Sequence, residues 1–197
     1  MTLTDAQIER YSRQIIVPRV GGRGQERLLA ARMLLVGDAR DIEAPLAYLV
    51  GAGVGAIGVR VVGNQAGFAR KVARTRELNA DVSVSEVHGR VDLALLLVGS
   101  EAVRKIADEI VHDSEVRALV IARLDAPGNI AVIPDLHSPR AADAPMLAAV
   151  GARSEAADFI AMLATAEAFK LVAGYAENPP RAIIEFDGYQ TMVRLLP

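Results

Sequence analysis

A strand, a turn and a helix near the start of the chain have the order with which α/β proteins bind phosphate. Residues 33–36 are a continuous apolar run, Gly37 follows it, and a helix is expected over residues 42–52. Such a turn binds phosphate through backbone N–H groups and the positive end of the helix dipole, and it needs glycines so that the backbone can approach closely. Only Gly37 is present here, because residues 38–44 read DARDIEA.

The residues that replace those glycines oppose phosphate binding. Ala39 adds a Cβ where the backbone has to come close, and Asp38, Asp41 and Glu43 bring negative charge to the start of the helix. The sequence therefore predicts a nucleotide-binding scaffold whose chemistry has been removed. A nicotinamide-dependent dehydrogenase would need the G-x-G-x-x-G turn and an acidic ribose ligand, and the chain has neither. A G-x-S-x-G nucleophile elbow is also missing.

Composition excludes several other classes of function. The 197 residues carry a net charge of −2, and no basic patch is interleaved with aromatics, so we expect no nucleic-acid partner. No apolar run approaches the roughly 18 residues of a membrane span, and the first residues lack a signal core, so we expect no membrane partner and a cytoplasmic location. The absence of cysteine excludes disulfides, thiolate metal sites and a cysteine nucleophile, and His88, His112 and His137 are isolated.

Strands and helices alternate along most of the chain. Thr4 and Gln7 form a capping-box pattern for an opening helix, Gly21, Gly22 and Gly24 are expected to end it, and a second helix is expected over 25–32. The further expected elements are strands at 56–62, 82–87, 93–98, 116–121 and 130–133, helices at 68–78, 101–112 and an alanine-rich 154–173, and a hairpin of 181–186 with 191–196 about the Asp-Gly turn at 187–188. This order predicts an α/β fold with a mixed sheet.

The two ends of the chain resemble the ThiF/MoeB/HesA family of adenylating enzymes, which are related to ubiquitin-activating enzymes. The opening match is the string ERYSRQIIVP at 9–18, and it continues without gaps to GVGAIG at 53–58. The closing match is AEAFKLVAG at 166–174, followed by IEFD at 184–187. The resemblance implies a Rossmann-like, mostly parallel sheet flanked by helices, with a C-terminal antiparallel hairpin. It also implies one domain over 1–197, with a helical dimerisation segment at 1–32, a core at 33–135 and a loop, long helix and hairpin at 136–197.

Members of this family activate the C-terminal carboxylate of a ubiquitin-like protein with ATP, forming an acyl-adenylate. The resemblance implies a glycine loop for the phosphates, acidic residues after the second strand for the ribose, and an Asp after the fourth strand for magnesium. In this chain the matching positions are Val61 and Gly63 after the second strand and Gly99 after the fourth. The family's zinc-binding and sulfur-transfer cysteines have no counterpart, so we expect no zinc.

The resemblance leaves a small set of vestigial nucleotide-binding candidates. These are Gly37, Arg13, Arg70 and Lys71. Arg13 matches an arginine that reaches the partner subunit's nucleotide, although a salt bridge at an interface would also explain it. Arg70 and Lys71 lie where basic residues would contact phosphates, although a solvated helix face would explain them equally well. A dimer interface is expected at Arg10, Tyr11, Arg13, Gln14 and Ile15.

Two functions follow from the resemblance and its gaps. The first is a pseudoenzyme without catalytic residues, metal or cofactor. It would form a homodimer, or a heterodimer with an active relative, in the activation of a ubiquitin-like or sulfur-carrier protein, with that carrier on the exposed sheet and hairpin. The second is an active adenylyltransferase with ATP and magnesium at a rebuilt site, in which Arg40, Arg60, Arg70 and Lys71 hold phosphate and Asp38, Asp41 or Glu43 holds the metal.

Overall fold

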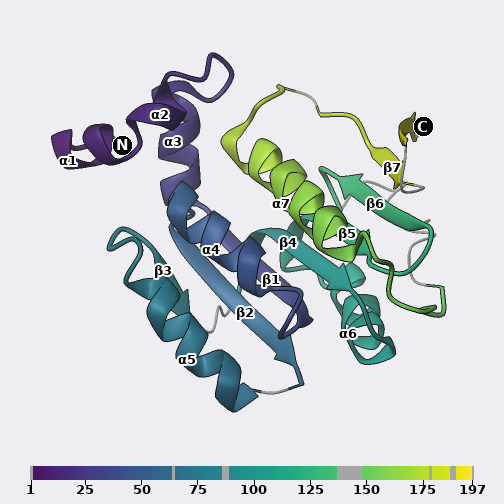
Figure 1. The fold of residues 1–197 in the computed structure, drawn as a ribbon. Coiled ribbons are helices and arrows are strands. Elements are labelled where there is room, and N and C mark those ends of the chain that lie inside the picture. Colours follow the sequence, from purple (N-terminus) through teal and green to yellow (C-terminus); the bar gives the residue numbers. More distant parts are fainter. Residues whose placement is uncertain are drawn as a thin grey trace.

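The computed structural model describes residues 2–63, 65–85, 89–136, 148–177, 179–186 and 190–196. Three helices open the chain, and strands and helices then alternate up to residue 123, except where two strands follow each other within residues 83–98 (Figure 1). The helices are α1 Asp5–Arg10, α2 Ser12–Ile15, α3 Gly21–Ala30, α4 Glu43–Ala52, α5 Gln65–Arg76, α6 Glu101–Val111 and α7 Ala157–Ala173. The strands are β1 Arg32–Asp38, β2 Ala56–Val62, β3 Ser83–Ser85, β4 Val91–Val98, β5 Val116–Arg123, β6 Gly128–Ile133, β7 Ala182–Phe186 and β8 Thr191–Leu195.

The strands form one eight-stranded sheet in the order β3-β2-β1-β4-β5-β6-β7-β8. From β3 to β5 all neighbours are parallel, and β6, β7 and β8 continue the sheet with antiparallel pairs. The central strand β4 is buried at every position but one, and β1 is buried at Met33 and from Leu35 to Gly37, which explains the apolar sequence of both strands. The predicted mixed α/β fold with antiparallel C-terminal strands is confirmed.

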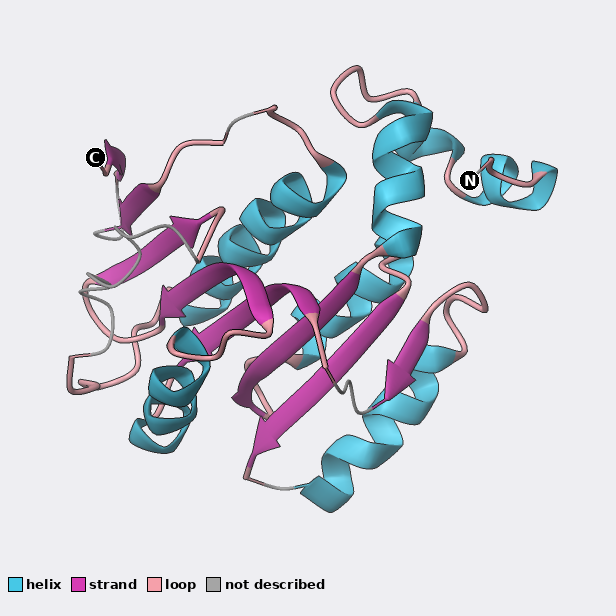
Figure 2. Ribbon diagram, turned by 180° about the vertical axis from the view of Figure 1, so that it is seen from behind, coloured by secondary structure: helices cyan, strands magenta, loops and turns pink. Residues whose placement is uncertain are grey.

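Helices cover both faces of this sheet (Figures 1 and 2). On one face, α4, α5 and α7 contribute Leu49, Phe68 and Ile160 to the larger apolar core. On the other face, α6 contributes Val103 and Ala107 to a second core. Alternate residues of β1 and β4 point into the two cores, as the pleat requires. Within the described part of the chain, no helix has both the length and the apolar character of a membrane-spanning segment.

The helices of the N-terminal segment differ from the predicted ones in where they end and begin. The capping box is present, since Thr4 accepts a hydrogen bond from the Gln7 N–H and Gln7 accepts one from the Thr4 N–H. The opening helix then breaks at Tyr11, and the glycine cluster begins α3 at Gly21 instead of separating two helices. Gly21 lies in the left-handed region with φ of +58°, which explains a glycine at this corner.

The alanine-rich helix packs inside its own chain. Ala157, Ala161, Ala164 and Ala168 of α7 are buried in the larger core, where the helix lies across β4, β5 and β6. Small side chains let the helix approach the sheet closely, so this stripe is not available to a second copy of the chain. The C-terminal strands β7 and β8 pair antiparallel as expected, while the predicted Asp-Gly turn at 187–188 and His137 lie outside the described residues.

The end of α7 depends on a glycine. Gly174 adopts φ of +68°, and a Cβ there would lie 1.7 Å from Nη1 of Arg27, whose guanidinium donates to the carbonyl oxygens of Ala173 and Gly174. We expect Gly174→Ala to lower the free energy of unfolding by about 1–2 kcal/mol, the cost of a left-handed residue that carries a Cβ. Urea denaturation measures this, with Gly22→Ala as the control, because a Cβ at Gly22 meets nothing within 4 Å. A loss equal to that of the control would contradict this account.

Candidate functional site

The sheet has a topological switch point between β1 and β4. The chain leaves β1 through α4 on one face of the sheet and leaves β4 through α6 on the other. The connections that follow these two neighbouring strands therefore run to opposite faces. Ligands of open α/β sheets bind in the crevice at such a point. Here the crevice is formed by Asp38 at the end of β1 and by Gly99 and Ser100 after β4.

Two carboxyl groups lie in this crevice. Asp38 and Asp41 flank a tight turn in which the Asp41 N–H donates to the Asp38 carbonyl at 2.9 Å. Oδ1 of Asp38 accepts a hydrogen bond from the Ser100 hydroxyl at 3.2 Å, and the Asp41 residue is only 3% exposed. The Oδ2 atoms of both residues are buried and have no hydrogen-bond partner among the described residues. Burial, and then the neighbouring Asp41 charge, raise the pKa of Asp38 despite the Ser100 hydrogen bond.

Gly37 and Gly99 of the crevice leave space that neighbouring side chains occupy. A Cβ at Gly37 would lie 2.7 Å from Cγ2 of Ile42 and 3.2 Å from Cβ of Leu97. Gly37 is therefore required so that the turn can fold its apolar Ile42 against β4. A Cβ at Gly99 would lie 2.6 Å from Oδ2 of Asp41 and 3.4 Å from Oδ2 of Asp38, so the two carboxyl groups converge on that glycine.

An arginine from a distant loop neutralises Asp41. Nη2 and Nε of Arg153 donate to Oδ1 of Asp41 at 2.8 and 3.2 Å, and Nη2 also donates to Asp158 of α7 at 2.6 Å. Arg153 belongs to residues 148–154, which we call the strap, and the strap lies beside the end of β5. Sequence reasoning missed Arg153, because it lies 112 positions from Asp41 in a stretch without periodic signals.

Hydrogen bonds fix the strap to the end of β5 and to the two residues that follow it. Arg123 pairs with Asp125, and its Nη2 also donates to the carbonyl oxygen of Ala149 at 2.9 Å. Asp125 in turn accepts a hydrogen bond from the Gly151 N–H at 2.9 Å, and the Ser154 N–H donates to the Leu124 carbonyl at 2.7 Å. Arg153 is therefore held in place by the backbone as well as by Asp41.

The start of α4 does not fit a triphosphate. Glu43 occupies its first turn, and Pro45 lacks one of the N–H donors with which a helix N-terminus binds an anion. The end of β2, with Val61, Val62 and Gly63, provides no carboxylate for a ribose. Glu43 and the carboxyl groups of the crevice therefore place acidic side chains beside the N-terminus of α4.

The predicted basic residues do not gather at the crevice. Lys71 forms an ion pair with Glu43, and Arg70 is exposed on α5. Arg60 pairs with Glu109 of α6, the helix that covers the other face of the sheet. Of these four predicted residues, Arg40 is the one that lies beside the carboxyl pair, with its Nε 3.8 Å from Oδ1 of Asp41 and its side chain mostly in solvent.

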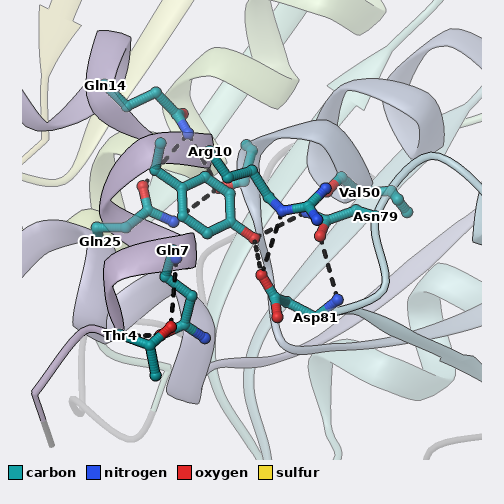
Figure 3. A network of polar contacts seen from close by, with 10 residues as sticks. Thr4, Gln7, Arg10, Gln14, Gln25, Val50, Asn79 and Asp81 are labelled. Atoms are coloured by element: carbon teal, nitrogen blue, oxygen red, sulfur yellow. Dashed lines mark hydrogen bonds and ion pairs between the residues drawn. The ribbon is translucent and has the colours of Figure 1, made fainter.

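Some of the predicted interface residues make contacts within their own chain, and Tyr11 is one of them. Tyr11 is 1% exposed, its hydroxyl donates to Asp81 at 3.1 Å, and that hydroxyl accepts a hydrogen bond from Asn79 at 2.8 Å (Figure 3). Asn79 also donates to the Val50 carbonyl at 2.8 Å. This network connects the N-terminal segment to α4 and to the loop that precedes β3. Tyr11 therefore has a structural role within its own chain.

Gln14 also makes contacts within the chain. Its Nε2 donates to Oε1 of Gln25 and to the Ala52 carbonyl at 3.3 and 3.2 Å, while Nε2 of Gln25 reaches the same carbonyl at 3.1 Å (Figure 3). Arg10 forms an exposed ion pair with Asp81 at 3.5 Å. Arg13 is exposed on α2 and Ile15 is half-buried. A dimer interface at these residues stays a prediction.

Comparison with known proteins gives relatives of one kind. No family model matches the sequence. The chain is 50% identical over 60 residues to a sulfur carrier protein adenylyltransferase of Thermus thermophilus, which is 30% of this chain and 22% of that protein. It is 35% identical over 130 residues to a SAMP-activating enzyme E1 of Haloferax volcanii, which is 55% of this chain and 48% of that protein. The matched regions thus span at most about half the length of these relatives.

Solved structures share the fold over nearly the whole chain. A crystal structure of E. coli MccB with ATP superposes with a TM-score of 0.69 at 14% identity, covering 94% of this chain and 71% of that one. A structure of PaaA superposes with a TM-score of 0.64 at 16% identity, covering 98% of this chain and 75% of that one. The sequence similarity therefore makes the chain a relative of the ThiF/MoeB/HesA family of adenylating enzymes, and the solved structures show that it shares the fold of MccB and PaaA.

Proposed function

We propose that this chain is a non-catalytic relative of the adenylating enzymes, which works as a binding partner in the activation of a ubiquitin-like or sulfur-carrier protein. The observation that carries the proposal is the placement of two carboxyl groups, Asp38 and Asp41, at the carboxyl end of β1, each with a buried Oδ2 that has no hydrogen-bond partner among the described residues. In the family this is the place of the phosphate-binding turn. These carboxyl groups offer acceptor oxygens where a polyphosphate needs N–H donors, and Arg153, the arginine that reaches Asp41, is already bound to Asp41 and Asp158.

Exposed apolar side chains support a role in binding proteins. Ile8, Ile16 and Val17 are exposed on the N-terminal segment, with Ile16 77% exposed. Figure 1 shows α1 and α2 projecting away from the sheet. At the other end of the molecule, Met192, Val193 and Leu195 are exposed on β8, the last strand of the sheet. The first region suits a second copy or an active relative, and the second suits a carrier protein.

Nucleotide binding and chemistry test the proposal directly. We expect Mg-ATP to leave the melting temperature unchanged, whereas a ligand at 100 times its Kd stabilises a protein by about 2.7 kcal/mol. We also expect no ATP–pyrophosphate exchange with a candidate carrier protein. The Thermus thermophilus adenylyltransferase, assayed with its own carrier, provides the positive control. Exchange above background by this chain alone would overturn the proposal.

One observation favours the second candidate, an active adenylyltransferase with a rebuilt site. The family's magnesium-binding Asp corresponds to Gly99, and Oδ2 of Asp41 lies 2.6 Å from the place of its missing Cβ. Asp41 thus supplies a carboxylate close to the family's metal-binding position. Under this candidate, Mg-ATP binds at micromolar concentration and Asp41→Asn abolishes the binding, while Asp108→Asn on the exposed face of α6 leaves it unchanged.

Self-association tests the partner role. We expect light scattering during size-exclusion chromatography to show a dimer, or a mixed complex with an active relative. Ile16→Asp should weaken that assembly, because it places a charge on an exposed apolar side chain of the N-terminal segment. A strictly monomeric protein at micromolar concentration that also forms no mixed complex would contradict this role.

A further inference from the structure

Strand β8 forms a fully exposed edge of the sheet. It is the last strand in the sheet order, and all five of its residues are exposed. Figures 1 and 2 show this end of the chain at the margin of the molecule, on the side opposite α1. The strand at the other edge, β3, has only three residues, and two of them are serines. A short polar edge is a poor template for a further strand, whereas a longer apolar edge is an open one.

The register of β8 on β7 determines which backbone groups face outward. The Leu196 N–H donates at 2.9 Å to the carbonyl of Arg181, the residue directly opposite. In an antiparallel ladder, such hydrogen-bonded pairs alternate with pairs whose N–H and C=O groups point the other way. Thr191, Val193 and Leu195 therefore direct their backbone groups away from β7. Each of them presents one N–H donor and one carbonyl acceptor along the edge.

The side chains of the same residues make this edge apolar. They lie on the α7 face of the sheet, because Val193 pairs with Ile184 of the larger core. Val193 and Leu195 are 59% and 63% exposed, and they border a groove of about 250 Å³ between β7, β8 and the C-terminal half of α7. Addition of a strand would cover these side chains and pair the outward backbone groups at the same time.

We propose that β8 pairs with β8 of a second copy of this chain, antiparallel and across a two-fold axis. The outward groups fix the register, because pairing centred on Val193 is the arrangement that joins all of them to counterparts in the second copy. Val193 then lies opposite Val193 of the second copy, and Thr191 lies opposite Leu195. Pairs of β-branched and apolar residues stabilise antiparallel strands. The sheet thereby continues through both copies.

The charges of β8 fit a second copy in this register. Arg194, on the other face of the strand, forms an ion pair with Glu185 at 3.5 Å. Centring on Val193 places Arg194 opposite Met192 of the second copy, whose neighbour on β7 is Glu185, so each arginine lies between two glutamates. Centring on Arg194 would instead place two like charges directly opposite each other, which is destabilising. This self-complementarity favours a second copy over a different protein as the occupant of β8.

The absence of cysteine from the chain permits a position-specific test. Val193→Cys places a thiol on each copy at opposite positions, where Cα atoms of a hydrogen-bonded pair lie about 5.5 Å apart, within the range of a disulfide. We expect mild oxidation of this variant to give a covalent dimer as the main product on a non-reducing gel. Leu195→Cys is the matched control. It is as exposed, but its counterpart in the second copy lies four residues along the strand, about 13 Å away, so it should stay mostly monomeric.

Two outcomes of the cross-linking experiment would overturn the proposal. One is the lack of a covalent dimer of Val193→Cys, and the other is an equal yield of dimer from Val193→Cys and Leu195→Cys, which random collision would give. Light scattering alone does not distinguish this contact from one at the N-terminal segment, whereas the position of the cross-link does.

Amide hydrogen exchange tests the unmodified protein. The N–H groups of Val193 and Leu195 should exchange more slowly as the protein concentration rises, by about tenfold once about nine tenths of the chains are paired, because only the unpaired fraction exchanges. The N–H groups of Met192 and Arg194 face β7 and should not respond to concentration. Exchange at Val193 that is independent of concentration would contradict the pairing. Slowing that appears only on addition of the carrier of the Thermus thermophilus adenylyltransferase would assign β8 to a carrier protein instead.

The pairing of β8 does not rest on the proposed function. Neither cross-linking nor amide exchange involves nucleotide. ATP–pyrophosphate exchange by this chain would overturn the proposed function and leave the pairing in place, and failure of the Val193→Cys cross-link would do the reverse. The two ideas therefore fail separately.

Discussion

Arg153→Met should lower the free energy of unfolding by about 3–5 kcal/mol at pH 7, because it leaves the buried Asp41 carboxylate without its counter-charge. The Asp41 side chain is fully buried and takes two hydrogen bonds from the guanidinium, so water cannot replace the lost partner. Methionine preserves much of the side-chain volume, which keeps the cavity term small.

Asp158→Asn is the control for this prediction. It removes the other carboxylate on Arg153, but that side chain is 86% exposed, so the change should stay within about 1 kcal/mol. Chemical denaturation of both variants at pH 7 makes the comparison. Equal losses in the two variants would mean that the Asp41–Arg153 pair does not hold the strap against the end of β1.

Tyr11→Ala should also cost about 3–5 kcal/mol, the usual range for removing a large buried aromatic side chain. The ring packs against Gly53, where a Cβ would lie 2.7 Å from three of its atoms, and the hydroxyl binds Asn79 and Asp81. Tyr11→Phe keeps the packing and removes only the hydroxyl. It should cost about 1–3 kcal/mol, because Asn79 and Asp81 lose a buried partner.

Measurements of stability and of self-association distinguish the structural role of Tyr11 from the association role expected of Ile16. Ile16→Ala changes a side chain that is 77% exposed, so its effect on unfolding should stay within about 0.5 kcal/mol. We expect this variant to weaken association, and Tyr11→Phe to lower stability while leaving the association of the folded protein unchanged. Loss of association without loss of stability in Tyr11→Phe would place the hydroxyl at an interface instead of within the chain.

Local sequence patterns predict most of the elements of this fold. The apolar runs of β1 and β4 required burial on both faces of a sheet, and the Thr4 capping box and the left-handed Gly53 mark helix ends as predicted. The expected helix bounds differ from the structure where local signals conflict. Gly21, Gly22 and Gly24 were expected to end a helix but lie in the first turns of α3, because tertiary packing outweighs their low helix propensity.

The sequence alone predicted the residues of the turn at the candidate site but not their distant partners. The sequence alone indicated that the turn after β1 had lost its glycines and gained Asp38, Asp41 and Glu43, because that inference depends on neighbouring residues. It could not show that Arg153 neutralises Asp41 or that Lys71 pairs with Glu43. When two partners are this far apart in sequence, whether they meet depends on which loops the fold brings to the same edge of the sheet. The same holds for Tyr11, whose hydroxyl binds Asn79 and Asp81, 68 and 70 positions away.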